Sequence, residues 1–394
     1  MRITGIKAFV LRVPQEDQFG GRGFHKETVA QSSRYQTQAG WKGVYSRETE
    51  TTLVRIETDD GLVGFGEAQS PVGPEVSAAV IANILHPILL GRDPMQTAVL
   101  YQEMYESMNI RGHFGGFMVH AIAAVDIALW DIKGKKLGCS IADLLGGAFR
   151  EGIPAYVSGI RGGTIDEKLS TVKEFARLGF RDLKVFLGFG LDKDCEYVKE
   201  IAQVLGPEHR LMVDVLWNYD VSTAIKLGRL LQNSEVGWLE APTSPEDIAG
   251  HAEIARALDV PIAGGETEVS SYQFLPWFQQ RALDIAQPDV ARCGITESQR
   301  IADLAQTFHI PIAWHAGICS APAIAASLQV AAATRNFIAM EYQPVMLQLA
   351  NRFLKTPMRC ESGKFTLPNK PGLGIEIDEN SLARYAREYV SSTA

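Results

Sequence analysis

The chain has 394 residues, of which 46% are hydrophobic and 21% are charged, the composition of an ordinary globular protein. Its 38 Lys and Arg residues against 46 Asp and Glu residues give a formal net charge of −8, and no basic cluster gathers along the chain. These features argue against nucleic acid or an anionic membrane as the main partner. At roughly 100–200 residues per domain the length predicts two domains, although an α/β barrel alone can take about 250 residues.

The five cysteines are scattered along the chain and never follow a C-x-x-C spacing. This pattern argues against a disulfide framework or a zinc knuckle. The N-terminal segment holds no apolar run of signal-peptide length, and no stretch approaches the roughly 18 uninterrupted apolar residues of a membrane span. We therefore expect a cytoplasmic protein.

The first part of the chain predicts an α+β unit. Residues 2–13 and 50–68 have the pattern of strands, and the Asp-Asp-Gly of 59–61 supplies a hairpin turn. Residues 14–48 are polar and rich in glycine and aromatic residues. This segment is too long for an ordinary connection, and we expect a functional lid rather than a disordered loop. Residues 75–137 turn helical, with apolar residues at three- and four-residue spacing.

From about residue 153 onward, short apolar strand-like segments alternate with helical segments at regular intervals. Eight such strands are typical of a parallel (β/α)₈-type barrel. An open doubly wound sheet is the alternative, but no G-x-G-x-x-G follows an early strand to support it. Residues 357–394 return to a turn-rich β pattern and are expected to pack on the first unit. The expected strands are 153–159, 181–188, 210–215, 236–240, 260–266, 282–290, 309–316 and 337–343.

Ionisable residues stand at the ends of six successive expected strands. The ends of barrel strands converge on one face, which is where active sites lie. We therefore predict that six side chains, far apart in sequence, ring one cavity, and their regular placement argues against a set of solvated surface positions. They are Asp214, Glu240, Glu266, Asp289, His315 and Glu341.

Three of these residues are carboxylates on adjacent strands: Asp214, Glu240 and Glu266. They cannot all stay ionised in a cavity without a cation, because like charges repel there. Ligands that are all oxygen suit a hard ion, and Mg²⁺ is the one we expect. The alternative is a protonated, hydrogen-bonded carboxylate without a metal. Zinc is disfavoured because neither Cys nor His is among the three.

Two further strand ends predict a general base. His315 and Asp289 are expected on neighbouring strands, within hydrogen-bond reach of each other. A carboxylate fixes the tautomer of an imidazole and raises its basicity, as a general base requires. Glu341, on the far side of this pair, is expected to be held protonated by the surrounding carboxylates and to donate to an oxyanion.

A lysine is expected to face the same cavity. Lys184 and Phe186 alternate with apolar residues on the strand 181–188, so both should point inward. A buried lysine beside a metal site would stabilise developing negative charge. The alternative for Lys184 is a surface lysine whose stem lies along apolar side chains.

With its six strand-end residues in order, the sequence resembles the enolase superfamily, specifically the mandelate racemase group. The resemblance covers nearly the whole chain. Residues 127–147 are similar to the group's link between cap and barrel, and residues 371–377 to its C-terminal return. The resemblance implies an α+β capping domain, from residues 1–130 and the tail 357–394, on a modified (β/α)₇β barrel over residues 131–356. It also implies a homo-oligomer, from dimer to octamer.

The resemblance further implies a shared first step, abstraction of the proton α to a carboxylate, with Mg²⁺ stabilising the enediolate. By position, the metal ligands would be Asp214, Glu240 and Glu266. The base would be the Asp289–His315 dyad, and Glu341 would donate a hydrogen bond to the substrate carboxylate.

Departures from the group's pattern narrow the reaction. Phe186 stands where the Lys-x-Lys motif has its second lysine, a base on the opposite face of the substrate, so only Lys184 matches. No lysine occurs between Lys226 and Lys355, where muconate-lactonising relatives place a base. Racemisation or epimerisation needs an acid or base on each face and is therefore disfavoured. A β-elimination can run from one side, with His315 removing the α-proton and then protonating the departing hydroxyl.

The resulting hypothesis is a Mg²⁺-dependent dehydratase that converts an aldonate or aldarate into a 2-keto-3-deoxy acid. The alternatives are an epimerase or racemase, a lactone cycloisomerase, and a barrel that only binds a ligand. Substrate contacts are expected from His25 and Arg47 in the lid, by gripping hydroxyls or a second carboxylate, although a surface role is equally open for both. Leu216 and Trp217, which follow the predicted metal ligand Asp214, resemble the rhamnonate-dehydratase pattern, and Trp217 is also expected to contact the substrate.

Overall fold

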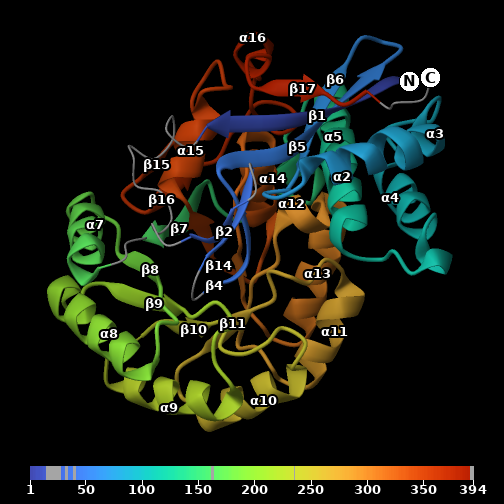
Figure 1. The fold of residues 1–394 in the computed structure, drawn as a ribbon. Coiled ribbons are helices and arrows are strands. Elements are labelled where there is room, and N and C mark those ends of the chain that lie inside the picture. The colour runs from blue at the N-terminus through green and yellow to red at the C-terminus, as the bar shows by residue number, and fades with distance from the viewer. Residues whose placement is uncertain (15–27, 32–33, 39–40, 161–163, 235, 391–394) are drawn as a thin grey trace.

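The fold is that of a closed parallel barrel with a separate antiparallel sheet packed against it (Figure 1). Eight strands follow one another in chain order around the barrel, and the last strand pairs with the first. This closure confirms the predicted barrel and rules out the open doubly wound sheet. The strands are β7 (Gly152–Ile160), β8 (Asp182–Phe186), β9 (Arg210–Asp214), β10 (Trp238–Glu240), β11 (Ile262–Gly264), β12 (Ile285–Ala286), β13 (Ile312–Trp314) and β14 (Phe337–Tyr342).

The computed structural model describes the chain with the exception of a few short segments. Those outside the description are residues 15–27, 32–33, 39–40, 161–163, 235 and 391–394.

Helices connect successive strands and form the outer wall of the barrel (Figure 1). Their apolar residues recur at three- and four-residue spacing and face the strands, as in α8, where Val198, Ile201 and Leu205 are buried. The helices are α7 (Ile165–Arg177), α8 (Leu191–Leu205), α9 (Val221–Leu231), α10 (Ile248–Ala257), α11 (Ser271–Gln279), α12 (Val290–Cys293), α13 (Ile295–Thr307) and α14 (Ala321–Ala333).

The barrel interior contains a packed layer to which seven of the eight strands contribute one apolar residue. Tyr156 and Trp238 are the large members of this layer, and its three alanines leave the space that the two aromatic side chains fill. The eighth strand, β8, has Lys184 at the corresponding place, since Lys184 pairs in register with Met212 of this layer. The apolar members are Tyr156, Met212, Trp238, Ala263, Ile285, Ala313 and Ala339.

The capping unit is built on a four-stranded antiparallel sheet in the order β17-β1-β5-β6. β5 and β6 form the predicted hairpin around the Asp-Asp-Gly turn. The C-terminal strand β17 pairs with β1, so both ends of the chain contribute to one sheet (Figure 1). The strands are β1 (Ile3–Pro14), β5 (Glu48–Thr58), β6 (Val63–Ala68) and β17 (Ala386–Glu388).

Helices cover this sheet and connect it to the barrel. The longest, α5 (Gly116–Leu137), packs on β5 and β6 and also contacts α12 and α13 of the barrel. The backbone of α5 lies close to β6 because Gly64 and Gly66 of β6 lack side chains. A Cβ at Gly66 would lie 1.9 Å from the Ala124 carbonyl oxygen. The other elements are α2 (Pro74–Val80), η1 (Ile81–Leu85), α3 (His86–Leu89), α4 (Thr97–Glu106), η2 (Asn109–Arg111) and α6 (Ile141–Leu144).

The expected lid over residues 14–48 contains more regular structure than predicted. Its described part forms a small antiparallel sheet of β2 (Thr28–Gln31), β3 (Tyr35–Gln38) and β4 (Trp41–Ser46). Aromatic and β-branched residues such as Tyr35 and Val44 favour strands, which the glycine-rich composition obscured.

The end of the chain returns to the capping sheet only in part. After α15 (Pro344–Asn351), the hairpin of β15 (Cys360–Glu361) and β16 (Lys364–Thr366) pairs with β7 of the barrel. The segment after α16 (Glu379–Leu382) pairs with β1 through β17, and Leu349 and Phe353 pack on the apolar residues Leu11 and Val13 of β1. None of the helices in the described part of the chain is long and apolar enough to span a bilayer.

Candidate active site

The six strand-end residues meet at one end of the barrel, as predicted. Asp214 and Glu240 pair in register on β9 and β10, and Asp289 and His315 form a bridge after β12 and β13. Five of the six side chains are buried, and the carboxylate-bearing side chain of Glu266 is 21% exposed. This end of the barrel therefore gathers five carboxylates, one imidazole and the ammonium of Lys184.

The predicted dyad is formed. His315 Nδ1 lies 2.6 Å from Asp289 Oδ2, so the imidazole donates to the carboxylate. Asp289 also accepts the backbone N–H of Ala291 at 2.8 Å and that of Gly317 at 3.3 Å. Burial alone would raise the pKa of Asp289, but the hydrogen bond and charge of His315 lower it. The carboxylate therefore stays ionised and binds Nδ1, which leaves Nε2 as the ring nitrogen that can take part in proton transfer.

The other imidazole nitrogen faces carboxylates. His315 Nε2 lies 2.8 Å from Glu266 Oε2 and 3.4 Å from Glu341 Oε2. Burial alone would lower the pKa of His315, but the charges of Glu266 and Glu341 raise it well above its ordinary value. The same pairing with His315 holds the pKa of Glu266 well below its ordinary value against the effect of burial. A cation that binds Glu266 would therefore lower the pKa of His315 and favour the neutral imidazole, the form that can accept a proton.

Lys184 lies at the centre of the carboxylates, with a side chain that is 1% exposed. Its Nζ is 2.5 Å from Glu240 Oε1, 3.2 Å from Glu341 Oε1 and 3.4 Å from Asp214 Oδ2. Burial disfavours its charge, but the charges of these carboxylates, Glu240 foremost, raise the pKa of Lys184 well above its ordinary value. The inward position is confirmed, and the surface alternative for Lys184 is wrong.

Glu341 differs from the expectation of a protonated donor. Its Oε2 accepts the backbone N–H of Ala316 at 3.1 Å. Burial alone would raise the pKa of Glu341, but the charges of Lys184 and His315 lower it. Lys184 and His315 are the two cations beside Glu341, and they outweigh the neighbouring carboxylates from which a protonated Glu341 was predicted.

Asp214, Glu240 and Glu266 fit a hard divalent cation by the chemistry of their donors. Burial raises the pKa of Asp214 well above its ordinary value, and the charge of Glu240 raises it further. A divalent cation would relieve that repulsion. Across the described residues, no group of three acidic, histidine or cysteine side chains has the arrangement of a metal site. In this structure Lys184 binds Glu240, and His315 binds Glu266. A cation would have to displace both contacts.

The predicted neighbours of the site lie at the same end of the barrel. The Phe186 ring centroid is 5.4 Å from Lys184 Nζ, so an aromatic ring stands where a second lysine could have faced the substrate. Leu216 and Trp217 follow Asp214 with φ angles of 52° and 55°. This left-handed turn is held by a hydrogen bond of 2.8 Å from the Trp217 N–H to the Ala241 carbonyl. Trp217 is half-buried there.

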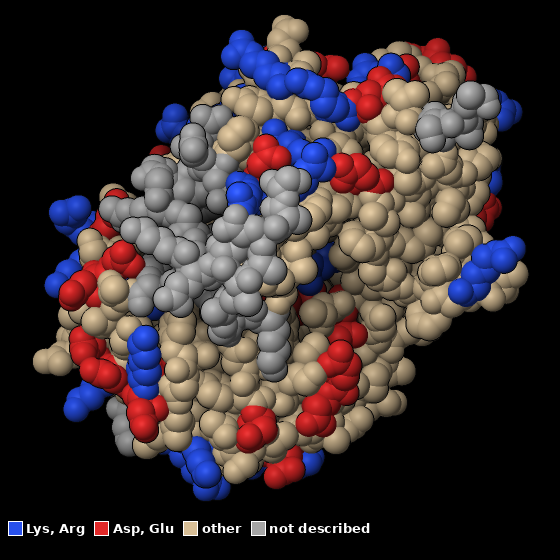
Figure 2. Space-filling model, in the orientation of Figure 1, with Lys and Arg blue, Asp and Glu red and all other residues tan. Residues whose placement is uncertain are grey.

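The two lid residues are not brought to the site by any described contact. Arg47 is exposed in the turn between β4 and β5, and its backbone N–H bonds the Arg34 carbonyl at 3.1 Å. His25 lies outside the described residues. On the face shown in Figure 2, acidic and basic side chains are interspersed rather than gathered into one basic field.

Two residues beside Glu240 were missed by the sequence argument. Trp238 Nε1 and Gln287 Nε2 both donate to Glu240 Oε2, at 2.9 and 2.8 Å. Trp238 precedes Glu240 by two positions and Gln287 precedes Asp289 by two, so strand alternation places each on the same inner face as its partner. That two-residue spacing is the signal in the sequence that identifies them.

The capping unit also reaches Glu266 through an arginine. Gln69, which follows β6, donates its backbone N–H to the Ala291 carbonyl at 3.0 Å and accepts a hydrogen bond from Arg292 Nε. Arg292 in turn donates from Nη1 to the Glu266 carbonyl at 2.5 Å. Gln69 lies so close to Gly317 that a Cβ there would be 1.8 Å from its Nε2. The capping unit thus packs against the segment that follows His315.

Glu67 of β6 anchors the helix that follows this segment. It accepts hydrogen bonds from the Ser320 N–H at 2.6 Å, the Ser320 hydroxyl at 2.9 Å, the Thr51 hydroxyl at 2.9 Å and the Ala323 N–H at 3.2 Å. A carboxylate there complements the positive end of α14. Burial raises the pKa of Glu67 to about 7, although its hydrogen bonds act in the opposite direction.

Asp126 of α5 makes a similar contact with α13. It accepts hydrogen bonds from the Thr296 N–H at 2.8 Å and hydroxyl at 2.6 Å. Burial raises its pKa to about 7 as well, again against these hydrogen bonds. Two buried acids of the capping unit therefore hold the helices that follow the two strands of the dyad.

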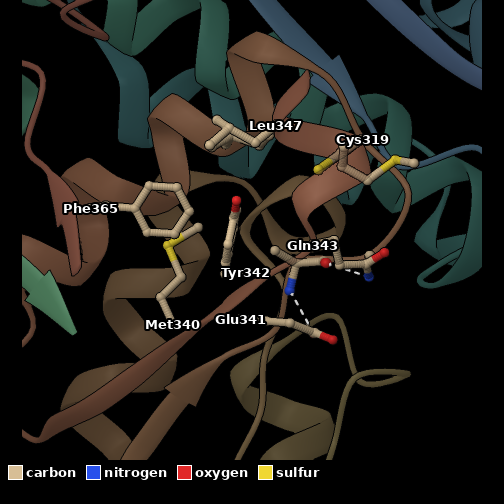
Figure 3. Close-up of a pocket in the computed structure, with 11 residues that line it drawn as sticks. Cys319, Met340, Glu341, Tyr342, Gln343, Leu347 and Phe365 are labelled. Carbon is tan, nitrogen blue, oxygen red and sulfur yellow. Dashed lines mark hydrogen bonds between the residues drawn. The ribbon is translucent and has the colours of Figure 1, made fainter. Parts of the chain in front are cut away.

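A small cavity of about 10 Å³ lies behind Glu341, with room for roughly one water molecule (Figure 3). Met340 and Phe365 lie on one side of it and Cys319 on the other. Gln343 Nε2 donates to the Ala316 carbonyl at 2.9 Å. The cavity is too small to hold anything larger than a water molecule.

Two family models match the chain. The model described as "Enolase C-terminal domain-like" matches residues 169–381. The model described as "Mandelate racemase / muconate lactonizing enzyme, N-terminal domain" matches residues 41–146. The N-terminal match covers most of the capping unit and the C-terminal match covers most of the barrel, in the order in which the chain contains them.

Curated proteins with similar sequences include two kinds of enzyme. D-galactarolactone cycloisomerase of Agrobacterium fabrum is 35% identical over 350 residues, covering 84% of this chain and 90% of that protein. Arabinonate dehydratase of Saccharolobus solfataricus is 32% identical over 355 residues, covering 87% and 92%.

Solved structures agree over nearly the full length. A member of the enolase superfamily from Agrobacterium tumefaciens has a TM-score of 0.93 at 32% identity, covering 98% of this chain and 99% of that one. A racemase from Streptomyces coelicolor A3(2), described with bound magnesium, has a TM-score of 0.83 at 27% identity, covering 98% and 100%.

Proposed function

Because the chain belongs to the mandelate racemase/muconate lactonizing enzyme family of the enolase superfamily, we propose that it is a Mg²⁺-dependent dehydratase of a sugar acid. The substrate would be an aldonate or aldarate, and the product a 2-keto-3-deoxy acid. The observation that carries the proposal is the buried pair of His315 and Asp289, with Phe186 rather than a second lysine beside Lys184 on β8.

We assign His315 as the base that removes the proton α to the substrate carboxylate. Its Nδ1 is committed to Asp289, so Nε2 is the atom that accepts the proton. The imidazolium then holds that proton on the same side of the substrate as the bond to be broken. It can deliver the proton to the oxygen on the β-carbon, and that oxygen leaves as water. One base therefore serves both halves of the elimination.

The ammonium of Lys184 and the metal would stabilise the negative charge that this step creates. Negative charge develops on the substrate carboxylate as the α-proton leaves, and we assign its stabilisation to Lys184, which lies among Asp214, Glu240 and Glu341. Asp214, Glu240 and Glu266 would hold Mg²⁺, which when bound neutralises that charge as a Lewis acid. We assign the recognition of substrate hydroxyls to Trp217, Arg47 and His25.

A lactone or anhydro-sugar cycloisomerase is the second candidate, and the 35% identical cycloisomerase supports it. Its chemistry would use the same groups. If the oxygen on the β-carbon belongs to a ring, the elimination by His315 opens that ring, and the departing oxygen stays attached to the product. The two functions therefore differ in the substrate and not in the base.

A screen of aldonates, aldarates, their lactones and anhydro acids with Mg²⁺ tests both candidates. Each reaction would be followed by the appearance of a 2-keto acid and by mass spectrometry. A dehydratase gives a product lighter than its substrate by one water, whereas a cycloisomerase gives a product of equal mass. Recovery of a C2 epimer without any keto acid would contradict both and favour an epimerase.

A further inference from the structure

The two carboxylate oxygens of Glu240 have different surroundings. Oε2 accepts hydrogen bonds from Trp238 Nε1 at 2.9 Å and from Gln287 Nε2 at 2.8 Å. Oε1 accepts one from Lys184 Nζ at 2.5 Å. Trp238 is 6% exposed and the other three residues are at most 2% exposed, so water does not compete for these contacts. One oxygen is thus held by two neutral donors and the other by a cation.

Both neutral donors are fixed by their own surroundings. Trp238 belongs to the apolar layer inside the barrel, where its ring meets the Tyr156 ring edge-on with centroids 5.0 Å apart. The backbone N–H of Gln287 donates to the Gly264 carbonyl at 2.8 Å. A carboxylate can only accept hydrogen bonds, so the Gln287 amide must direct its NH₂ group toward Glu240. Neither donor can turn away without leaving a buried polar group unpaired.

The other two proposed metal ligands are held differently. Asp214 accepts one backbone N–H, from Leu216 at 3.0 Å, and its second oxygen lies 3.4 Å from Lys184 Nζ. Glu266 directs Oε2 to His315 at 2.8 Å, and its Oε1 is 4.0 Å from Arg292 Nη2. Of the three carboxylates, Glu240 alone has one oxygen occupied by two neutral side-chain donors.

We infer that Trp238 and Gln287 restrict Glu240 to a single metal-binding oxygen, Oε1, and thereby make the site select Mg²⁺ over Ca²⁺. The inference rests on the proposed role of Glu240 as a ligand. Mg²⁺ requires a small octahedral shell, which a carboxylate bound through one oxygen suits. Ca²⁺ takes six to eight oxygen ligands, and carboxylates often supply two of them. Trp238 and Gln287 act through Glu240 and are positioning residues.

Calorimetric titration of the full-length protein with MgCl₂ and, separately, with CaCl₂ tests this inference, after removal of metals with a chelator. We expect the wild type to bind Mg²⁺ more tightly than Ca²⁺. In Gln287→Met and in Trp238→Phe, Mg²⁺ affinity should fall by about 10- to 100-fold, as is typical when a partner of a metal ligand is lost. Affinity for Ca²⁺ should fall less or rise, because the released Oε2 becomes available to it.

Matched substitutions elsewhere control for a general loss of packing. Gln329→Met removes a buried amide of α14 that donates to the Pro368 carbonyl at 2.7 Å. Trp277→Phe alters a buried indole of α11 whose ring lies 4.8 Å from that of His251. Both should leave the ratio of Ca²⁺ to Mg²⁺ dissociation constants unchanged. Circular dichroism verifies folding, and either of the two test variants alone suffices if the other does not fold.

The outcomes separate this inference from the proposed function. A ratio that falls at least about tenfold in a test variant, and not in the controls, supports it. Equal weakening of both ions, or an unchanged ratio in both test variants, would overturn it while leaving the metal site in place. A wild type that binds neither ion would instead overturn the proposed metal ligands.

Discussion

His315 Nδ1 lies 2.6 Å from Asp289 Oδ2, and the backbones of the two residues are bridged, with the His315 N–H bonded to the Pro288 carbonyl at 3.0 Å. Side chain and main chain therefore fix the imidazole together. The ring cannot rotate without breaking a buried charge-assisted hydrogen bond. This rigidity leaves Nε2 as the single proton acceptor that the elimination requires.

Asp289→Asn should lower kcat for keto-acid formation by about 10²- to 10⁴-fold, the range of general-base effects. The asparagine keeps the size of the side chain but not the charge that fixes the tautomer and raises the basicity of His315. KM should change much less, since Asp289 is buried and acts through His315. Asp192→Asn, at an exposed position of α8, is the matched control and should behave like the wild type. Equal activity of Asp289→Asn and the control would contradict the assignment.

Lys184→Met should destabilise the protein by about 3–5 kcal/mol in the absence of Mg²⁺, because it removes the cation shared by buried carboxylates. Excess Mg²⁺ should then raise the melting temperature of this variant more than that of the wild type, since the ion no longer competes with an ammonium. Differential scanning calorimetry with and without Mg²⁺ measures both effects.

Lys168→Met is the matched control for that comparison. Lys168 is also a buried lysine, but it donates to the Phe186 carbonyl at 3.0 Å rather than to the carboxylates. Its variant should lose stability without any extra gain from Mg²⁺. An equal gain from Mg²⁺ in both variants would show that Lys184 and the ion do not share the same carboxylates.

The buried acid Glu67 should make stability depend on pH. Its pKa is raised to about 7 in the folded protein, from an ordinary value of 4.5. The folded state therefore holds a proton that the unfolded chain releases between these values, and stability falls as pH rises through this window, by on the order of 3 kcal/mol. Glu67→Gln cannot titrate and should show a smaller loss of stability between pH 5 and pH 8.

Urea unfolding at several pH values measures that slope. Asp126 titrates in the same direction, so Glu67→Gln should flatten the slope only in part. Glu253→Gln, at an exposed position of α10, should keep the wild-type slope. A slope in Glu67→Gln as steep as in this control would mean that the carboxyl at position 67 does not titrate in this range.

The barrel and its catalytic face could be predicted because both depend on local patterns. Short apolar strands alternate with helices, and six successive strands end in an ionisable residue, as with Glu240 and His315. Parallel pairing then brings those ends together. The hairpin around the Asp-Asp-Gly turn was predicted for the same reason, since its register follows from adjacent residues.

Features that depend on distant contacts could not be predicted. The ionised state of Glu341 results from Lys184 and His315, which lie far from it in sequence and near it only in the folded barrel. Glu67 bonds to Ser320 across more than half the chain. No local pattern in the sequence marks either contact. The strands within residues 28–46 were missed because glycine and polar residues interrupt the pattern there.

The most direct measurement is the fate of the α-proton in D₂O, followed by NMR with the substrate found in the screen. We expect the wild type with Mg²⁺ to form a 2-keto-3-deoxy acid with solvent deuterium at C3, where the enol left by the elimination takes up a proton. We expect His315→Asn to form no product and to exchange no α-proton. Undiminished turnover by His315→Asn, or a wild type that returns a deuterated C2 epimer without keto acid, would contradict elimination by a single base.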